Sequence, residues 1–269
     1  MDARLMKLLT DDDPAVFTIE HERGKSPFFI TVDHGGRRLP KQLGNLGLTE
    51  AELRRHIAWD IGAGAVSRQL GDALGAFTIH QTYSRLVIDC NRDPSVAASI
   101  VTVSESTEIP GNRNLGQAER EARAREILWP YHRRIVEALD RRKAAGLPTV
   151  LIAMHSFTPV FKGVARPWQV GVLYNRDSRF AHVVKAVLEA EGDLVVGDNE
   201  PYAVGDATDY TIPVHGERRH LPHVEIEIRQ DLIAEEPGQR SWAKRLAHVL
   251  PEAYRRLEQD RIGWNQANP

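Results

Sequence analysis

The run TVLIAM at residues 149–154 is apolar after its first residue and leads directly into His155 and Ser156. A short apolar run of this kind is typical of a strand that is buried on both faces of a sheet. Five other runs have a similar length and a strand-like composition, at residues 27–33 (PFFITVD), 76–81 (AFTIHQ), 85–90 (RLVIDC), 169–174 (QVGVLY) and 223–229 (HVEIEIR). We predict a strand at each of these places.

Segments with helical spacing alternate with the strand-like runs. Thr49 and Glu52 have the spacing of a capping box, and apolar residues follow at near-helical intervals up to Leu74. Further helices are predicted at about 117–145, with a break or kink at Pro130, at 178–191, and at 241–261 with Pro251 inside. Strands that alternate with helices favour an α/β fold: a three-layer sandwich with a mixed, largely parallel sheet flanked by helices.

Composition and charge narrow the function classes. The 269 residues contain no repeat and no linker rich in Pro, Gly or Ser, so we expect one domain over residues 1–269 with a core at about 26–262. A formal net charge of −2 argues against nucleic-acid binding by phosphate neutralisation. No run approaches the roughly 18 apolar residues of a membrane span, and the amino terminus lacks the apolar core of a signal peptide. With Cys90 as its single cysteine, the chain is predicted to be cytoplasmic.

Two long segments resist assignment to helices or strands, at residues 95–115 and 192–221. Structureless loops of this length are uncommon unless they bind something. We therefore expect both segments to form walls of a site.

Polar side chains lie at or just past the ends of the predicted strands, where ligands gather in open α/β sheets. They are Asp33, His34, Asn91, Arg92, His155 and Arg176, and the strand at 223–229 itself carries Glu225 and Glu227. A hydrophobic core needs none of them, so they are candidates for binding and catalysis.

His34 and His155 are the candidate metal ligands, because a catalytic zinc site takes neutral imidazoles and a carboxylate from separate elements. Asp60, which follows Trp59, is the candidate third ligand. Asp33 competes with it, either as a ligand or as a partner that orients a histidine. The alternatives are histidines that merely cap strand ends and an ordinary exposed acid at Asp60. Zinc is the predicted ion, although these ligand types suit other divalent metals as well.

Glu225 and Glu227 are two residues apart on one strand and therefore share a face. If that face lines a cleft, one glutamate can act as general base on a metal-activated water and then deliver the proton to the leaving group. The alternative is a solvated edge strand. Arg92 and Arg176 are candidates for binding a substrate carboxylate, unless they are ordinary surface arginines.

Several short motifs follow one another along the chain. They are 26–27 (SP), 33–40 (DHGGRRLP), 59–63 (WDIGA), 83–85 (YSR), 89–94 (DCNRDP), 129–132 (WPYH), 155–157 (HSF), 198–202 (DNEPY) and 225–232 (EIEIRQDL). Together they resemble the N-formylglutamate amidohydrolase family over about residues 26–233. The resemblance implies a fold similar to that of zinc carboxypeptidases and a zinc hydrolase that cleaves a formyl amide to formate and an amino acid.

The resemblance also implies roles for single residues. His34 and His155 match two histidine ligands, Asn91-Arg92 match a pair that holds a substrate carboxylate, and residues 227–229 match the strand with the catalytic glutamate. Carboxypeptidases take their third ligand, a glutamate, three residues after the first histidine. Arg37 stands at that position here, so Asp60 as third ligand is an inference from this chain alone.

Tyr202 and His215, both in the segment 192–221, are further candidates for substrate binding. The complete hypothesis is a metal-dependent amidohydrolase of a small N-formyl or other N-acyl amino acid, most concretely N-formylglutamate. One alternative is a zinc deacylase or carboxypeptidase-like hydrolase of another carboxylate-bearing amide or ester. A non-catalytic anion-binding module on the same fold and a purely structural or interaction protein are the others.

Overall fold

The computed structural model describes residues 6–267, and their side chains up to residue 259. Its centre is a seven-stranded sheet in the order β1-β3-β2-β6-β11-β9-β10. The strands are β1 (Phe17–Glu20), β2 (Phe28–Val32), β3 (Phe77–Gln81), β6 (Val150–Phe157), β9 (Val170–Leu173), β10 (Val196–Asp198) and β11 (His223–Arg229). The strands β2, β3, β6 and β11 are parallel, whereas β1 and the pair β9–β10 run the opposite way. The predicted mixed, largely parallel sheet is confirmed.

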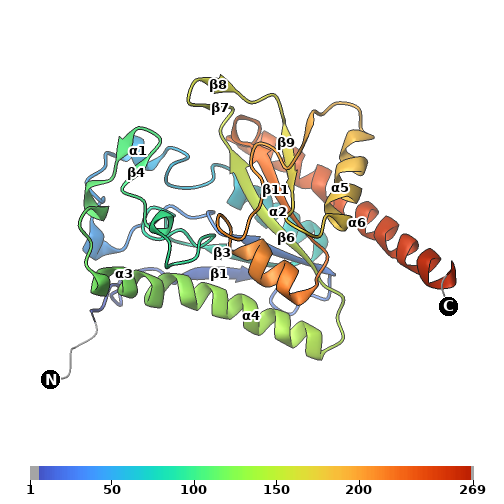
Figure 1. Ribbon diagram of the computed structural model, residues 1–269, viewed down its shortest axis with the longest axis horizontal. Coiled ribbons are helices and arrows are strands. Elements are labelled where there is room, and N and C mark those ends of the chain that lie inside the picture. Colours follow the sequence, from blue (N-terminus) through green and yellow to red (C-terminus); the bar gives the residue numbers. More distant parts are fainter. Residues whose placement is uncertain (1–5, 268–269) are drawn as a thin grey trace.

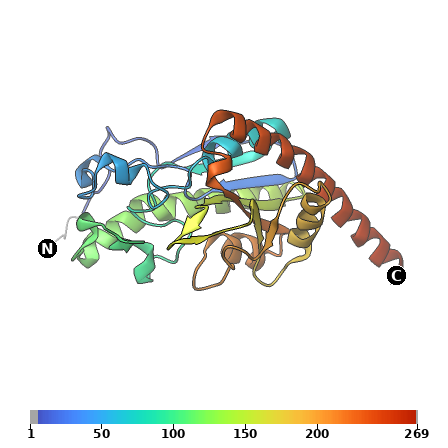
Figure 2. The same cartoon turned by 90° about the horizontal axis from the view of Figure 1, so that it is seen from above.

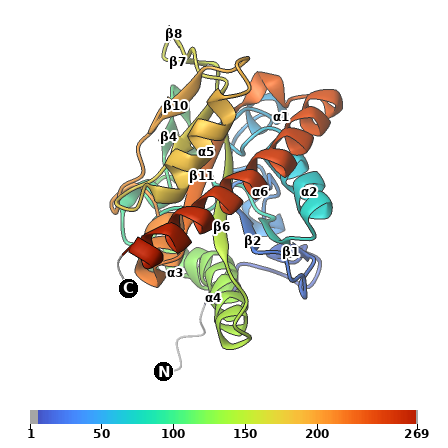
Figure 3. The same ribbon diagram turned by 90° about the vertical axis from the view of Figure 1, so that its right-hand side faces the viewer.

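Helices cover both faces of this sheet, as a three-layer sandwich requires (Figure 1). On one face lie α2 (Ala63–Leu74), α5 (Arg179–Glu189) and α6 (Glu236–Ala267), with α6 packed against both others (Figure 3). On the other face lie α3 (Gln117–Arg123) and α4 (Trp129–Ala144), drawn in green in Figure 2. Two small hairpins complete the fold, formed by β4 (Val103–Ser104) with β5 (Thr107–Glu108), and by β7 (Val160–Phe161) with β8 (Val164–Ala165).

The alternation of side chains along the strands decides which layer each residue joins. In β6, Ile152 and Met154 belong to the core beneath α2, α5 and α6, whereas Leu151 and Ala153 belong to the core beneath α4. His155 continues the second series, because alternate residues of a strand point to the same face. The side chain of His155 therefore lies on the face of the sheet that α4 covers.

The strand β11 lies inside the sheet, between β6 and β9, so the alternative of a solvated edge strand is wrong. In the parallel ladder Glu225 pairs with Ala153 and Glu227 pairs with His155. Residues paired in this way project from the same face. Both glutamates therefore share the face of His155.

Residues 85–90 do not form the predicted strand and run as turns and irregular chain. Side chains, instead of a neighbouring strand, bind their carbonyl groups: Asn112 Nδ2 donates to Leu86 O (2.8 Å) and Arg123 Nη1 donates to Val87 O (2.9 Å). The segment is as buried and apolar as a strand, which is why its composition misled the prediction.

The predicted helix at 49–74 is two helices, α1 (Glu50–Leu53) and α2, joined by turns. The capping box at Thr49 is confirmed. The break has a backbone cause: Asp60 N donates to His34 O (2.9 Å), and Gly62 adopts a left-handed φ of 80°. A Cβ atom on Gly62 would lie 2.1 Å from Ile233 O, so the chain turns there before α2 begins.

The other predicted helices are present with shifted bounds. The segment 117–145 runs on through a π-helical turn (Ala124–Leu128) directly before Pro130, and a wider turn accommodates a proline ring within a helix. Likewise, α6 continues through Pro251. The strands β1 and β10 were not predicted, because β1 is partly exposed and β10 is only 3 residues long. Within residues 6–267 no helix combines the length and the apolar character needed to cross a bilayer.

Candidate functional site

A cavity of about 350 Å³ opens at the carboxyl ends of β2, β6 and β11. Its polar lining residues include His34, Asp60, Arg85, Asn91, Arg92, His155, Tyr202, Asp209, Glu225 and Glu227. The segment 192–221 forms one wall, as predicted, through Tyr202 and Asp209 among others. The segment 95–115 lines a smaller adjoining cavity of about 210 Å³ with Ala98, Val101 and Ser104.

Three candidate metal ligands meet at the base of the cavity. His34 follows β2, Asp60 lies in the turn before α2, and His155 is in β6. One oxygen of Asp60, Oδ2, lies 2.8 Å from His155 Nδ1 and 3.5 Å from His34 Nδ1. One potential ligand atom from each residue lies within 4.8 Å of the others, and all three side chains are buried. The fold thus brings together residues that are far apart in the sequence.

The donor set of this group fits a metal ion. Two imidazoles and a carboxylate are the ligands of many catalytic zinc sites. Among the described residues, the buried His34 Nδ1 has no hydrogen-bond partner, although it faces Asp60. A buried polar atom without a partner is unfavourable unless something else satisfies it. A cation between the three side chains would satisfy it.

Carboxylates also lie at the far nitrogen of each imidazole. His34 Nε2 is 2.6 Å from Asp89 Oδ1, and His155 Nε2 is 3.6 Å from Asp33 Oδ2. Asp33 therefore lies behind His155 and outside the group of three, where it accepts a hydrogen bond from the Tyr131 hydroxyl (2.8 Å). Carboxylates in this position can orient a ligating imidazole. Asp33 is placed for that role, although its Oδ2 lies beyond hydrogen-bond distance of His155 Nε2.

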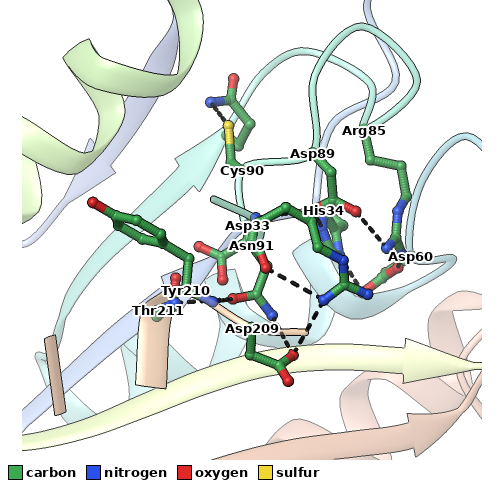
Figure 4. Close-up of polar contacts among 12 residues, drawn as sticks. Asp33, His34, Asp60, Arg85, Asp89, Cys90, Asn91, Asp209, Tyr210 and Thr211 are labelled. Atoms are coloured by element: carbon green, nitrogen blue, oxygen red, sulfur yellow. Dashed lines mark hydrogen bonds and ion pairs between the residues drawn. The ribbon is translucent and has the colours of Figure 1, made fainter. Parts of the chain in front are cut away.

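Arg85 connects two of these carboxylates (Figure 4). Its Nη2 donates to Asp89 Oδ2 (2.6 Å) and its Nη1 donates to Asp60 Oδ1 (3.5 Å). Burial alone would raise the pKa of Asp89, but Arg85 and His34 hold it well below its usual value. Sequence reasoning missed both Arg85 and Asp89 as site residues because it placed them in a strand. The signal that could have identified them is a charged residue near each end of the otherwise apolar run 85–90.

The two glutamates of β11 have unusual electrostatics. Burial raises the pKa of Glu225 and of Glu227 to about 8. Glu225 Oε2 lies 4.0 Å from His155 Nε2, the nitrogen turned away from Asp60. The pKa of Glu227 also responds to the charges of His155, Asp60 and Arg85. Both carboxyl groups therefore lie within electrostatic reach of His155.

The Asn91-Arg92 pair also lines the cavity. Asn91 Oδ1 accepts hydrogen bonds from the backbone N–H groups of Tyr210 and Thr211, both at 2.9 Å. These bonds fix the side-chain amide of Asn91, so its NH₂ group faces Asp209.

Two predicted substrate-binding residues are not brought into the cavity. The guanidinium of Arg176 is exposed and pairs with Asp206 (2.9 Å) and Glu217 (2.9 Å). His215 is buried, with its Nε2 3.0 Å from His132 Nδ1, outside the cavity lining. Both residues follow an apolar segment, but side-chain direction and loop path cannot be read from that position. Tyr202 does line the cavity, and its hydroxyl accepts a hydrogen bond from Arg166 (2.9 Å).

Known proteins resemble this chain over most of its length. The family model for N-formylglutamate amidohydrolase matches residues 26–234. An N-formylglutamate deformylase of Pseudomonas aeruginosa is 25% identical over 92% of this chain and 97% of that protein. A solved gene product of Agrobacterium tumefaciens is 36% identical with a TM-score of 0.91, covering 94% of this chain and 100% of that one. An N-formylglutamate amidohydrolase of Ralstonia eutropha shares the fold, with a TM-score of 0.70 and 20% identity over 93% of this chain and all of that one.

The family match covers the three candidate metal ligands, the Asn91-Arg92 pair and both glutamates of β11. It therefore spans every polar residue named above for the lining of the larger cavity. The chain belongs to the N-formylglutamate amidohydrolase family and is a hydrolase of amide bonds.

Proposed function

We propose that this amidohydrolase converts N-formylglutamate and water to glutamate and formate, with zinc held by His34, Asp60 and His155. The observation that carries the proposal is the group of two imidazoles and one carboxylate beside the buried glutamates of β11. The substrate follows from the names of the family and of the relatives. A zinc ion there would supply Lewis acidity toward water and the formyl carbonyl group.

Glu227 is the proposed general base. It would accept a proton from the attacking water and pass it to the leaving nitrogen as the C–N bond breaks. Its pKa near 8 reflects burial without a metal, and a nearby divalent cation favours the ionised form. Glu225, which approaches the far nitrogen of His155, would hold that imidazole in place.

The arginines would orient and stabilise the substrate. Arg92 with Asn91 offers the donors for a carboxylate, and Arg85 places a positive charge beside Asp60, where the carbonyl oxygen becomes negative. Within the described part of the chain, Arg85 and Arg92 are the arginines that line the cavity. The placement of Arg176 outside it favours, as a second candidate, an N-acyl amino acid with one carboxylate.

Chelation should abolish formate release from N-formylglutamate, and about one equivalent of zinc should restore it. Metal content and formate are measured on the same sample before and after chelation, with N-acetylglutamate and N-formylleucine as comparison substrates. Full activity of the metal-free protein would contradict the metal site. A zinc-loaded protein that prefers N-formylleucine would favour the second candidate.

Asp89→Asn should weaken zinc binding by about 10–100-fold, because the hydrogen bond that orients His34 loses its charge. Competition with a chromophoric chelator measures the affinity. Asp72→Asn is the matched control, since Asp72 makes a similar contact with His21 (2.8 Å) on the surface. Equal zinc affinities of the two variants would show that Asp89 does not support the ligand.

A further inference from the structure

Asp209 places a carboxylate at the position where the proposed substrate carboxylate would bind. Its Oδ1 accepts a hydrogen bond from Asn91 Nδ2 (3.1 Å; Figure 4). The same oxygen lies 3.6 Å from Arg92 Nη1. The side chain is only 12% exposed, and it lines the cavity. The donors proposed for the substrate thus already have an internal carboxylate as partner.

The loop that carries Asp209 holds the other oxygen of the same carboxylate. Asp209 Oδ2 accepts hydrogen bonds from Gly205 N (3.0 Å) and Thr208 Oγ1 (2.8 Å), and Asp209 N donates to Gly205 O (2.9 Å). The carboxylate is therefore divided between its own loop and the Asn91-Arg92 pair. The contacts within the loop involve neither Asn91 nor Arg92.

The contact between Asp209 and Arg92 affects how a substrate carboxylate can bind in the cavity. Arg85 already pairs with Asp60 and Asp89, so among the described residues that line the cavity Arg92 is the arginine that remains for a substrate carboxylate. A substrate carboxylate that approached Arg92 with Asp209 still in contact would face a like charge at close range. Binding of that carboxylate to Asn91 Nδ2 and Arg92 Nη1 therefore competes with Asp209 Oδ1.

We propose that Asp209 is a specificity-determining residue that competes with the substrate carboxylate for Asn91 and Arg92. This inference rests on the proposed function. A ligand with a carboxylate that reaches both donors replaces the internal contact, whereas a ligand with a neutral amide at that position gains little from doing so. The competition lowers affinity for the right substrate, and an uncharged analogue that leaves Asp209 in place forgoes contact with both donors.

The test is Asp209→Asn in the zinc-loaded protein. If the free enzyme has Asp209 released in roughly a tenth of molecules, KM for N-formylglutamate should fall about tenfold with kcat unchanged. The dissociation constant of glutarate, measured by calorimetry without turnover, should fall by the same factor. Asp206→Asn is the matched control, because it removes the same charge from the same loop but pairs with Arg176 outside the cavity.

Two control variants separate direct competition from charge repulsion at a distance and from loop mobility. Asp206→Asn removes the same charge without touching Oδ1, so an equal gain in that variant would assign the effect to charge repulsion at a distance and overturn the proposal. Thr208→Ala loosens the loop without touching Oδ1, so an equal gain in that variant would assign the effect to loop mobility and also overturn it. An unchanged or raised KM in Asp209→Asn, with Tm unchanged, would show that Asp209 only braces the loop.

Glutarate binding distinguishes failure of the proposed function from failure of the proposed competition by Asp209. If no variant releases formate, the proposed function fails, while tighter glutarate binding by Asp209→Asn still supports the competition. If Asp209→Asn unfolds, Asp209→Glu serves in its place: its longer side chain cannot keep the same divided contacts, and glutarate should again bind more tightly than to wild type. Weaker or equal binding by that variant would overturn the inference.

Discussion

Glu227→Gln is expected to lower kcat for formate release by about 10³-fold and to leave zinc content at the wild-type level. The amide preserves the shape of the side chain but cannot accept a proton from water. Because Glu227 lies outside the group of His34, Asp60 and His155, the ligand atoms are unchanged. Steady-state formate release and metal analysis on one preparation measure both quantities.

Glu225→Gln is the control for this prediction, because Glu225 is equally buried, has a similarly raised pKa and lies two residues away on the same strand. It contacts the far nitrogen of His155, so we expect a much smaller loss of kcat. A fully active Glu227→Gln enzyme with normal zinc would rule out Glu227 as the base. A larger loss of kcat in Glu225→Gln than in Glu227→Gln would make Glu225 the general base and Glu227 the residue that holds His155.

His155→Ala should lose both zinc and activity. Loss of an orienting partner already costs about 10–100-fold in metal affinity, so loss of a ligand itself should exceed that range. The variant also removes the 2.8 Å hydrogen bond between His155 Nδ1 and Asp60 Oδ2, and loss of a hydrogen bond to a charged group costs about 1.5–3 kcal/mol of stability. Equilibrium dialysis with zinc and thermal unfolding give the two quantities.

The matched control is His80→Ala, which removes another buried histidine with a carboxylate partner, Glu20 (3.0 Å), from a strand of the same sheet. Its zinc content and activity should match those of the wild type while its Tm falls. Zinc retained by His155→Ala at wild-type affinity would show that the ion binds elsewhere. Zinc lost equally from both variants would indicate a general effect of destabilisation.

The sequence predicts the sheet well where strands are buried on both faces, because such strands are short and apolar. The same logic fails at 85–90, where Asn112 and Arg123 bind the backbone in place of a neighbouring strand. No local pattern distinguishes these cases, since the partners lie 26 and 36 residues away.

The candidate site likewise combines residues that local sequence patterns predict with residues whose positions depend on distant partners. His34 and His155 are predictable because each lies at the end of an apolar run, and parallel strands bring such ends together. Arg176 lies near such an end too, but Asp206 and Glu217 draw its side chain outward. The position of Asp209 depends on the path of a loop that approaches Asn91 from 118 residues away, and no periodicity encodes that path.

The pairing of Glu227 with His155 in the ladder of β6 and β11 has an evolutionary consequence. Backbone hydrogen bonds set the separation of the proposed base from the proposed metal ligand, and they do not depend on side-chain identity elsewhere. In the proposed mechanism, substitutions in residues 199–211 would therefore change which acid is accepted and leave the position of Glu227 unchanged. Relatives that differ in this segment should be a source of new selectivity on an unchanged reaction.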